Sequence, residues 1–112
     1  MSKQIEIEDF LKIQMHVGTI LSAKPNARAS KPAYILEVDF GGDLGIKITS
    51  AQITDFYNCD DLPGIQVVAV TNFPPLRVAG VKSEVLVLGT VTEEGVILLR
   101  PDRPVQNGMN IA

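Results

Sequence analysis

The stretch AYILEVDFGGDLGIKIT, residues 33–49, decides the fold because its side chains alternate between apolar and polar. Every second residue from Tyr34 to Phe40 is apolar, whereas Glu37 and Asp39 fall on the opposite face of an extended chain. Successive side chains of a β-strand point to opposite faces of the sheet. The period of two therefore predicts a strand with one face in the core.

The residues after this strand predict the second half of a hairpin and then a short helix. Two consecutive glycines supply the positive φ of a turn. In GIKIT, we expect Ile46 and Ile48 to face the core and Lys47 to face solvent. Thr49 and Gln52 stand at the spacing of a capping box, in which each side chain bonds the backbone amide of the other. A short helix is therefore predicted to begin there.

Further strands are predicted on both sides of this hairpin. Gly18, inside KIQMHVGTILSA, indicates a bulge or a bend in the first of them. The run IQVVAVTNF has no polar side in its middle, which predicts a strand buried on both faces. IEDFLKI predicts one or two helical turns before the first strand, and a turn is expected from Thr92 to Gly95. The further strands comprise residues 12–23, 65–73, 83–91 and 95–100.

The order of these elements predicts a mainly β fold. Three strands, a short helix, two more strands and a final extension that includes residues 95–100 suit a five-stranded Greek-key barrel of the oligonucleotide/oligosaccharide-binding type (OB-fold), with N- and C-terminal extensions. Closing a sheet into a barrel removes most of its exposed edges. A mixed sandwich is the main alternative. At 112 residues, the chain is expected to form a single domain, 1–112.

Composition favours a cytoplasmic protein that is not inserted into a membrane. No apolar run approaches the roughly 18 residues that a membrane-spanning helix needs. The first ten residues, MSKQIEIEDF, carry charges where a signal peptide would be apolar. Cys59 is the only cysteine, so neither an intrachain disulfide nor a cysteine-based metal site is expected.

Few residues of the sequence suggest a catalytic site. His16 is the only histidine, and a surface or packing role is expected for it rather than general base catalysis. Cys59 stands beside Asp60 and Asp61, whose negative charges disfavour a thiolate nucleophile. We therefore expect a protein that is not an enzyme and that uses no metal or cofactor.

Basic residues are segregated in a chain that is acidic as a whole. The net charge is −3, yet residues 10–36 and 62–83 contain no Asp or Glu. If these two stretches meet in space, they form one basic face; the alternative is a solvated surface on which the charges are separated by chance. The residues of this predicted basic rim are Arg28, Lys31, Arg77 and Lys82, and Lys47 is expected to project near them.

The basic rim predicts an anionic or extended partner. In OB-fold barrels, basic side chains neutralise phosphates and exposed aromatic rings stack on bases. Aromatic residues make up only 5% of the chain, and Tyr34 and Phe40 are expected in the core rather than as stacking platforms. Recognition of the shape and backbone of a folded RNA is therefore favoured over stacking on a single strand.

Several ordered stretches resemble one protein family, the tRNA-binding domain family. They are NFPPLRVAGVKSEVLVLG at residues 72–89, HVGTI, AYILEVDFG and the closing LLRPDRPVQNG, and the match covers nearly the whole chain. This family is a dimeric OB-fold barrel that occurs alone or appended to methionyl- and tyrosyl-tRNA synthetases. Within it, KITSAQIT and VTNFPPLRVAGVKSEVLVLG look most like the CsaA-type branch, stand-alone bacterial proteins described as chaperones associated with secretion.

The resemblance carries over to individual residues. The family's asparagine at the end of the fourth strand falls on Asn72, its basic-x-x-glycine connector on residues 77–80, and the serine that follows on Ser83. For this serine and the connector glycine, a local structural role is the alternative to ligand contact. The tRNA-binding members have glycine and methionine where this chain has Val85 and Leu86. The CsaA-type members share the form of this chain, SEVLVLG.

The resemblance also implies a homodimer. The segments outside the minimal barrel would form it, here residues 2–13 and 101–112. Both segments carry apolar residues that a bare five-stranded barrel does not obviously need. The alternative is that they pack on their own barrel.

Two hypotheses for function follow. The first is chaperone-like binding of unfolded or export-destined polypeptides, with the export machinery as a further partner and the basic rim selecting acidic segments. The second is structure-specific tRNA binding through the same face. The candidate ligand-binding residues are Arg28, Lys31, Lys47, Asn72, Arg77, Lys82 and Ser83, and the candidate peptide contacts are Phe73, Pro74, Pro75 and Leu76.

Overall fold

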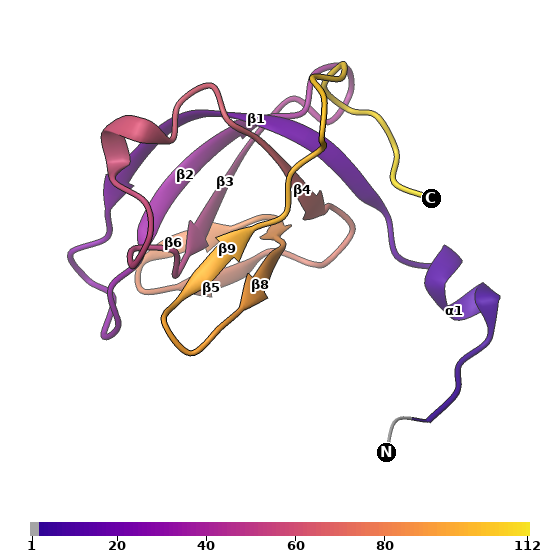
Figure 1. Ribbon diagram of the computed structural model, residues 1–112, viewed down its shortest axis with the longest axis horizontal. Helices are drawn as coiled ribbons and strands as arrows, with labels where there is room; N and C mark the ends of the chain where they lie inside the picture. Colours follow the sequence, from indigo (N-terminus) through magenta and orange to yellow (C-terminus); the bar gives the residue numbers. More distant parts are fainter. Residues whose placement is uncertain (1–2) are drawn as a thin grey trace.

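Five strands form one antiparallel sheet in the order β3-β2-β1-β4-β7, which curls into a nearly closed barrel (Figure 1). The computed structural model describes residues 3–112. Its elements are α1 (Ile7–Leu11), β1 (Met15–Pro25), β2 (Tyr34–Asp39), β3 (Ile46–Ala51), η1 (Cys59–Asp61), β4 (Gln66–Val70), β5 (Leu76–Val78), β6 (Val81–Ser83), β7 (Leu86–Val87), β8 (Gly89–Val91) and β9 (Val96–Leu98). The predicted mainly β, OB-like fold is confirmed.

The core is built from the alternating residues that the sequence singles out. Leu36, Val38 and Phe40 are fully buried, as are Ile20 on β1 and Val67 on β4. The strand predicted from the period of two is therefore confirmed as β2. β1 is long enough to serve two neighbours, because its first half pairs with β4 and its second half with β2.

The bulge predicted at Gly18 lies elsewhere. The register of β1 against β2 shifts between Ile20 and Ser22 instead. Gly18 has a packing role, since a Cβ there would lie 2.7 Å from a methyl carbon of Val38 and 2.8 Å from the ring of Phe40. Glycine at this position lets the Phe40 ring lie directly against the β1 backbone.

The faces predicted for β3 are wrong. The turn pairs Asp39 with Ile46, and cross-strand partners share a face, so Ile46 and Ile48 lie outside with exposures of 55% and 38%. Lys47 and Thr49 instead lie on the core face, opposite Val38 and Leu36 respectively. The sequence pattern predicts that alternate residues share a face, but the turn decides which of the two sets of alternate residues is buried.

The helix predicted from the capping box at Thr49 and Gln52 is also absent. β3 continues to Ala51, and the helical element between β3 and β4 is the single 3₁₀ turn η1. The reason is a tertiary contact. Thr49 is only 1% exposed, and its hydroxyl donates a hydrogen bond of 2.8 Å to the carbonyl of Val85. Val85 is 36 residues away in the chain, across the seam where β3 meets residues 83–85, so it cannot be read from local spacing.

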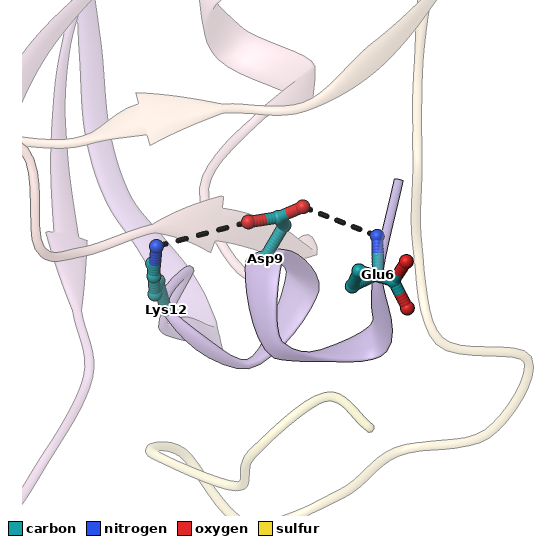
Figure 2. Close-up of polar contacts among 3 residues, drawn as sticks. All are labelled: Glu6, Asp9 and Lys12. Atoms are coloured by element: carbon teal, nitrogen blue, oxygen red, sulfur yellow. Dashed lines mark hydrogen bonds and ion pairs between the residues drawn. The ribbon is translucent and has the colours of Figure 1, made fainter. Parts of the chain in front are cut away.

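The N-terminal helical turns are confirmed as α1. Asp9 organises this helix: its Oδ2 accepts a 3.1 Å hydrogen bond from the Glu6 backbone amide, and its Oδ1 lies 3.7 Å from Lys12 Nζ (Figure 2). Both side chains of the ion pair are largely exposed, so the pair contributes little stability. No residue of α1 is buried, and the helix stands apart from the barrel (Figure 1).

The region after β4 contains more strands than the sequence predicts. The connector at residues 76–83 forms a hairpin of its own, β5 with β6. The strand predicted at 83–91 divides into β7 and β8, and β8 pairs with β9 across the predicted turn, where the Thr92 amide donates to the Gly95 carbonyl at 2.9 Å. Among residues 3–112, no helix is long and apolar enough to cross a membrane.

Candidate binding surface

The β5–β6 hairpin is the centre of the candidate surface. Ala79 and Gly80 form its two-residue turn with φ values of +48° and +82°. Positive φ at both turn positions matches the right-handed twist of the flanking strands, and glycine takes it without strain. The hairpin therefore projects as a defined two-stranded element, with Arg77 opposite Lys82.

The structure brings the first part of the basic rim against this hairpin. Asn26, 8% exposed, donates from Nδ2 to the Ala79 carbonyl at 3.5 Å and accepts from the Arg28 amide at 3.1 Å. A Cβ on Gly80 would lie 2.5 Å from Arg28 Nη1, so the guanidinium of Arg28 lies directly over this glycine. The two acid-free stretches thus meet in space, which is the condition under which the sequence predicts one basic face.

A hollow of about 300 Å³ lies beside this contact between the Arg28 loop and the hairpin. Its lining includes Arg28 and Lys31 from the loop, Ser50 and Gln52, and Val78 and Ala79 from the hairpin. Arg77 and Lys82 lie on the exposed face of the hairpin, where Arg77 Nη1 donates to the Gly80 carbonyl at 3.2 Å. Lys47 does not belong to this group, because it lies on the core face of β3 and lines neither this hollow nor the apolar groove described next.

An apolar groove of about 500 Å³ adjoins the hollow and shares Ser50 and Val78 with it. All four candidate peptide contacts line the groove, and two of them are well exposed, Phe73 at 51% and Leu76 at 67%. Residues 83–86 form its remaining wall. Large apolar side chains that remain exposed around a concave surface are typical of an interaction site.

Two of the candidate ligand-binding residues are engaged within the fold. The Ser83 hydroxyl accepts from the Ser50 amide at 3.2 Å and lies 3.0 Å from the Thr49 hydroxyl, which closes the barrel between β3 and β6. Asn72 donates from Nδ2 to the Lys12 carbonyl at 2.7 Å and accepts from the Gln14 amide at 3.0 Å. Asn72 therefore joins the segment after α1 to the end of β4, and it lines neither the hollow nor the apolar groove.

A second apolar groove, of about 670 Å³, lies between the two ends of the chain. Ile7 and Leu11 of α1 line it with exposures of 63% and 67%, and Ile111 lines it from the C-terminal tail. The tail is fixed to its own barrel, because Val17 donates to the Met109 carbonyl at 3.0 Å and Ile111 to the Met15 carbonyl at 3.0 Å. Ser2, the first residue of the predicted dimer segment, lies outside the described residues.

His16 and Tyr34 are partly buried within the barrel. His16 Nδ1 lies 2.7 Å from the Thr71 hydroxyl, which joins β1 to the end of β4. Partial burial raises the pKa of Tyr34 above its ordinary value, and the neighbouring Cys59 thiol adds to this effect. Within residues 3–112, no group of three or more His, Cys, Asp or Glu side chains is placed to hold a metal ion.

Residues 15–110 match the family described as "Putative tRNA binding domain". The chain belongs to the tRNA-binding domain family. Two solved structures are similar to it over nearly their whole length. The chaperone CsaA of Bacillus anthracis is 49% identical, with a TM-score of 0.92 over 98% of this chain and 100% of that one. The CsaA chaperone of Picrophilus torridus is 46% identical, with a TM-score of 0.92 over 97% of this chain and 100% of that one.

The chain is also similar to part of a much longer relative. The methionine–tRNA ligase of Thermococcus onnurineus is 32% identical over 107 residues, which cover 96% of this chain and 14% of the ligase. The chain therefore spans about one seventh of the length of this relative.

The sequence did not reveal every residue of the surface. Ser50 and Gln52 line the hollow, although neither of them is basic or aromatic. The acidic residue directly after Ser83 in the family motif, Glu84, lines the apolar groove. For the other two, no local pattern points to the hollow, because the capping-box spacing assigns them to a helix.

Proposed function

We propose that this protein is a homodimeric binding protein with chaperone-like activity toward unfolded or export-destined polypeptides. The observation that carries the proposal is the apolar groove beside the β5–β6 hairpin, with Phe73 and Leu76 exposed at its edge. An unfolded chain exposes apolar side chains that a folded protein buries, and such a groove can shelter them. The likeness to two structures named CsaA chaperones supports this choice.

The basic rim supplies the second part of the ligand site. The hollow lined by Arg28 and Lys31 adjoins the groove, so a bound segment can place apolar side chains in the groove and acidic side chains at the rim. Opposite charges favour such an arrangement and speed encounter. Export-destined precursors remain unfolded before transport, which makes the export machinery a proposed partner and the cytoplasm the proposed location.

A homodimer accounts for the exposed apolar surface at the chain ends. Ile7 and Leu11 lie on a helix with no buried residue, beside a groove that Ile111 also lines. A second copy related by a two-fold axis would cover this surface with the same surface of its own. The dimer would then carry two grooves and two basic rims.

The groove is tested with fluorescence anisotropy of a labelled, permanently unfolded polypeptide. Leu76→Asp should weaken binding about tenfold, because burial of a leucine side chain is lost and a charge is placed in the groove. Leu76 is 67% exposed, so this change should leave the fold intact. Unchanged affinity of a folded Leu76→Asp variant would exclude the groove as the polypeptide site.

The rim is tested by charge reversal with a matched control. Arg77→Glu with Lys82→Glu should weaken binding of acidic segments about tenfold, which corresponds to two partly exposed ion pairs. Lys24→Glu with Arg100→Glu changes the net charge equally at exposed positions that line neither hollow nor groove and lie outside the predicted dimer segments, and should have no effect. An equal loss in both double variants would show that only net charge matters.

Structure-specific tRNA binding is the second candidate function. The family match and the four basic side chains of the rim favour it. Four phosphate contacts would give a slope of about −3.6 in a plot of log affinity against log salt concentration. A flat salt response would remove this candidate. The two functions are compatible because the groove and the rim are adjacent but chemically different.

A further inference from the structure

Glu84 introduces a negative charge into the apolar groove. Of the described residues that line the groove, it alone is charged, and its side chain is half-buried. A carboxylate that is partly removed from water interacts more strongly with a nearby charge than an exposed one does. The groove therefore differs in sign from the basic rim that adjoins it.

The Glu84 carboxylate is held in place by the barrel. The backbone amide of Ile48 donates to Oε1 at 3.0 Å, and the Glu84 amide donates to the Ile48 carbonyl at 2.8 Å. Backbone and side chain are thus both fixed to β3. Oε2 has no hydrogen-bond partner among residues 3–112, and the ion pairs within that range are Asp9–Lys12 and Asp102–Arg103. A fixed carboxylate with a spare oxygen is ready to accept from a ligand.

The two cationic side chains of the hairpin, Arg77 and Lys82, lie on the face that is turned away from the groove. Leu76 and Val78 line the groove, so Arg77 between them points away from it, together with its cross-strand partner Lys82. Arg28 lies over Gly80 at the tip. The ion pairs within residues 3–112 do not include Glu84, so a cationic group of a ligand can pair with its carboxylate.

The free edge of β5 favours a ligand in extended conformation. The two-residue turn makes Val78 and Val81 a hydrogen-bonded pair, and such pairs alternate with non-hydrogen-bonded ones along a ladder. The backbone N–H and C=O of Arg77 consequently point away from β6, and β5 has no other strand beside it in the described residues. An extended polypeptide can pair with this edge while its side chains enter the groove.

We propose that Glu84 determines the charge of the segment that the groove accepts: an extended polypeptide in which Lys or Arg adjoins a large apolar residue. The same carboxylate repels phosphates, which confines an RNA backbone to the basic rim. This inference rests on the proposed polypeptide-binding function and specifies its ligand. Acidic residues of the same polypeptide would lie outside the groove, toward Arg28 and Lys31.

The test uses three labelled peptides with the same apolar residues, in which the neighbouring position is Lys, Gln or Glu. They are titrated by fluorescence anisotropy against the wild type, Glu84→Gln, and the control Glu94→Gln at the exposed β8–β9 turn. Glutamine at 84 keeps an oxygen to accept from Ile48, so the fold should be retained. The wild type should prefer Lys over Gln over Glu, and Glu84→Gln should lose about fivefold for the Lys peptide.

The outcomes separate this inference from the function on which it rests. Loss of the Lys preference in Glu84→Gln alone, with stronger binding of tRNA, supports the inference. Peptide binding that is indifferent to the neighbouring charge, or a preference that survives in Glu84→Gln, overturns the inference and leaves the polypeptide-binding function standing. Failure of the wild type to bind any of the three peptides, or an unfolded polypeptide, overturns the function itself.

Discussion

Replacement of Thr49 by valine should open the seam that shapes the groove. Thr49 is almost completely buried, and its hydroxyl donates to the Val85 carbonyl at 2.8 Å and lies 3.0 Å from the Ser83 hydroxyl. Valine has nearly the same shape but leaves the buried carbonyl without this donor. Such a loss costs about 1 to 3 kcal/mol of the free energy of unfolding.

The effect can be measured by thermal unfolding followed by circular dichroism. With an unfolding entropy of about 2.1 cal/mol/K per residue, a chain of 112 residues loses about 4 °C per kcal/mol, so Tm should fall by about 4 to 12 °C. Thr90→Val makes the same chemical change at an exposed site of β8 and should leave Tm nearly unchanged. A Thr49→Val protein that melts with the wild type would refute the role assigned to this hydroxyl.

Three further changes test other parts of the structure. Gly18→Ala should lower the free energy of unfolding in urea by about 1 to 3 kcal/mol, because the new Cβ meets the Phe40 ring; equal stability would contradict that packing. Leu11→Asp should halve the mass measured by light scattering without changing Tm of the barrel, whereas a persistent dimer would place the interface elsewhere. The raised pKa of Tyr34 means that the folded state keeps its proton longer than the unfolded state; stability should therefore fall as pH rises above about 10, and Tyr34→Phe should lose part of this dependence.

The strand at residues 34–39 could be predicted because its alternation is complete and its buried set is the apolar one. The faces of β3 could not, because both alternate sets of that strand contain residues that can be buried. Ile46 and Ile48 are more apolar than Lys47 and Thr49, yet the turn pairs Asp39 with Ile46 and turns the isoleucines outward. Register, rather than residue preference, decides the face.

Only part of the candidate surface could be predicted, because some of its features are visible in the sequence and others depend on contacts between distant residues. The absence of acids in both stretches is visible in the sequence, but whether the stretches meet could not be read from it; the contact between Arg28 and Gly80 shows that they do. The roles of Asn72 and Ser83 depend on partners 58 and 33 residues away, respectively, so no local pattern reveals that they act within the fold. The same holds for the capping-box residue Thr49, whose partner Val85 comes from the other side of the seam.

The most direct measurement of the proposed function is a pair of fluorescence-anisotropy titrations of the purified protein at low and at physiological salt. One uses a labelled unfolded polypeptide and the other labelled tRNA. We predict that polypeptide binding persists at physiological salt, because burial of apolar side chains in the groove is not screened by ions, whereas tRNA binding through the rim falls steeply. Tight tRNA binding with no measurable polypeptide binding under either condition would contradict the proposed function and identify an RNA-binding protein instead.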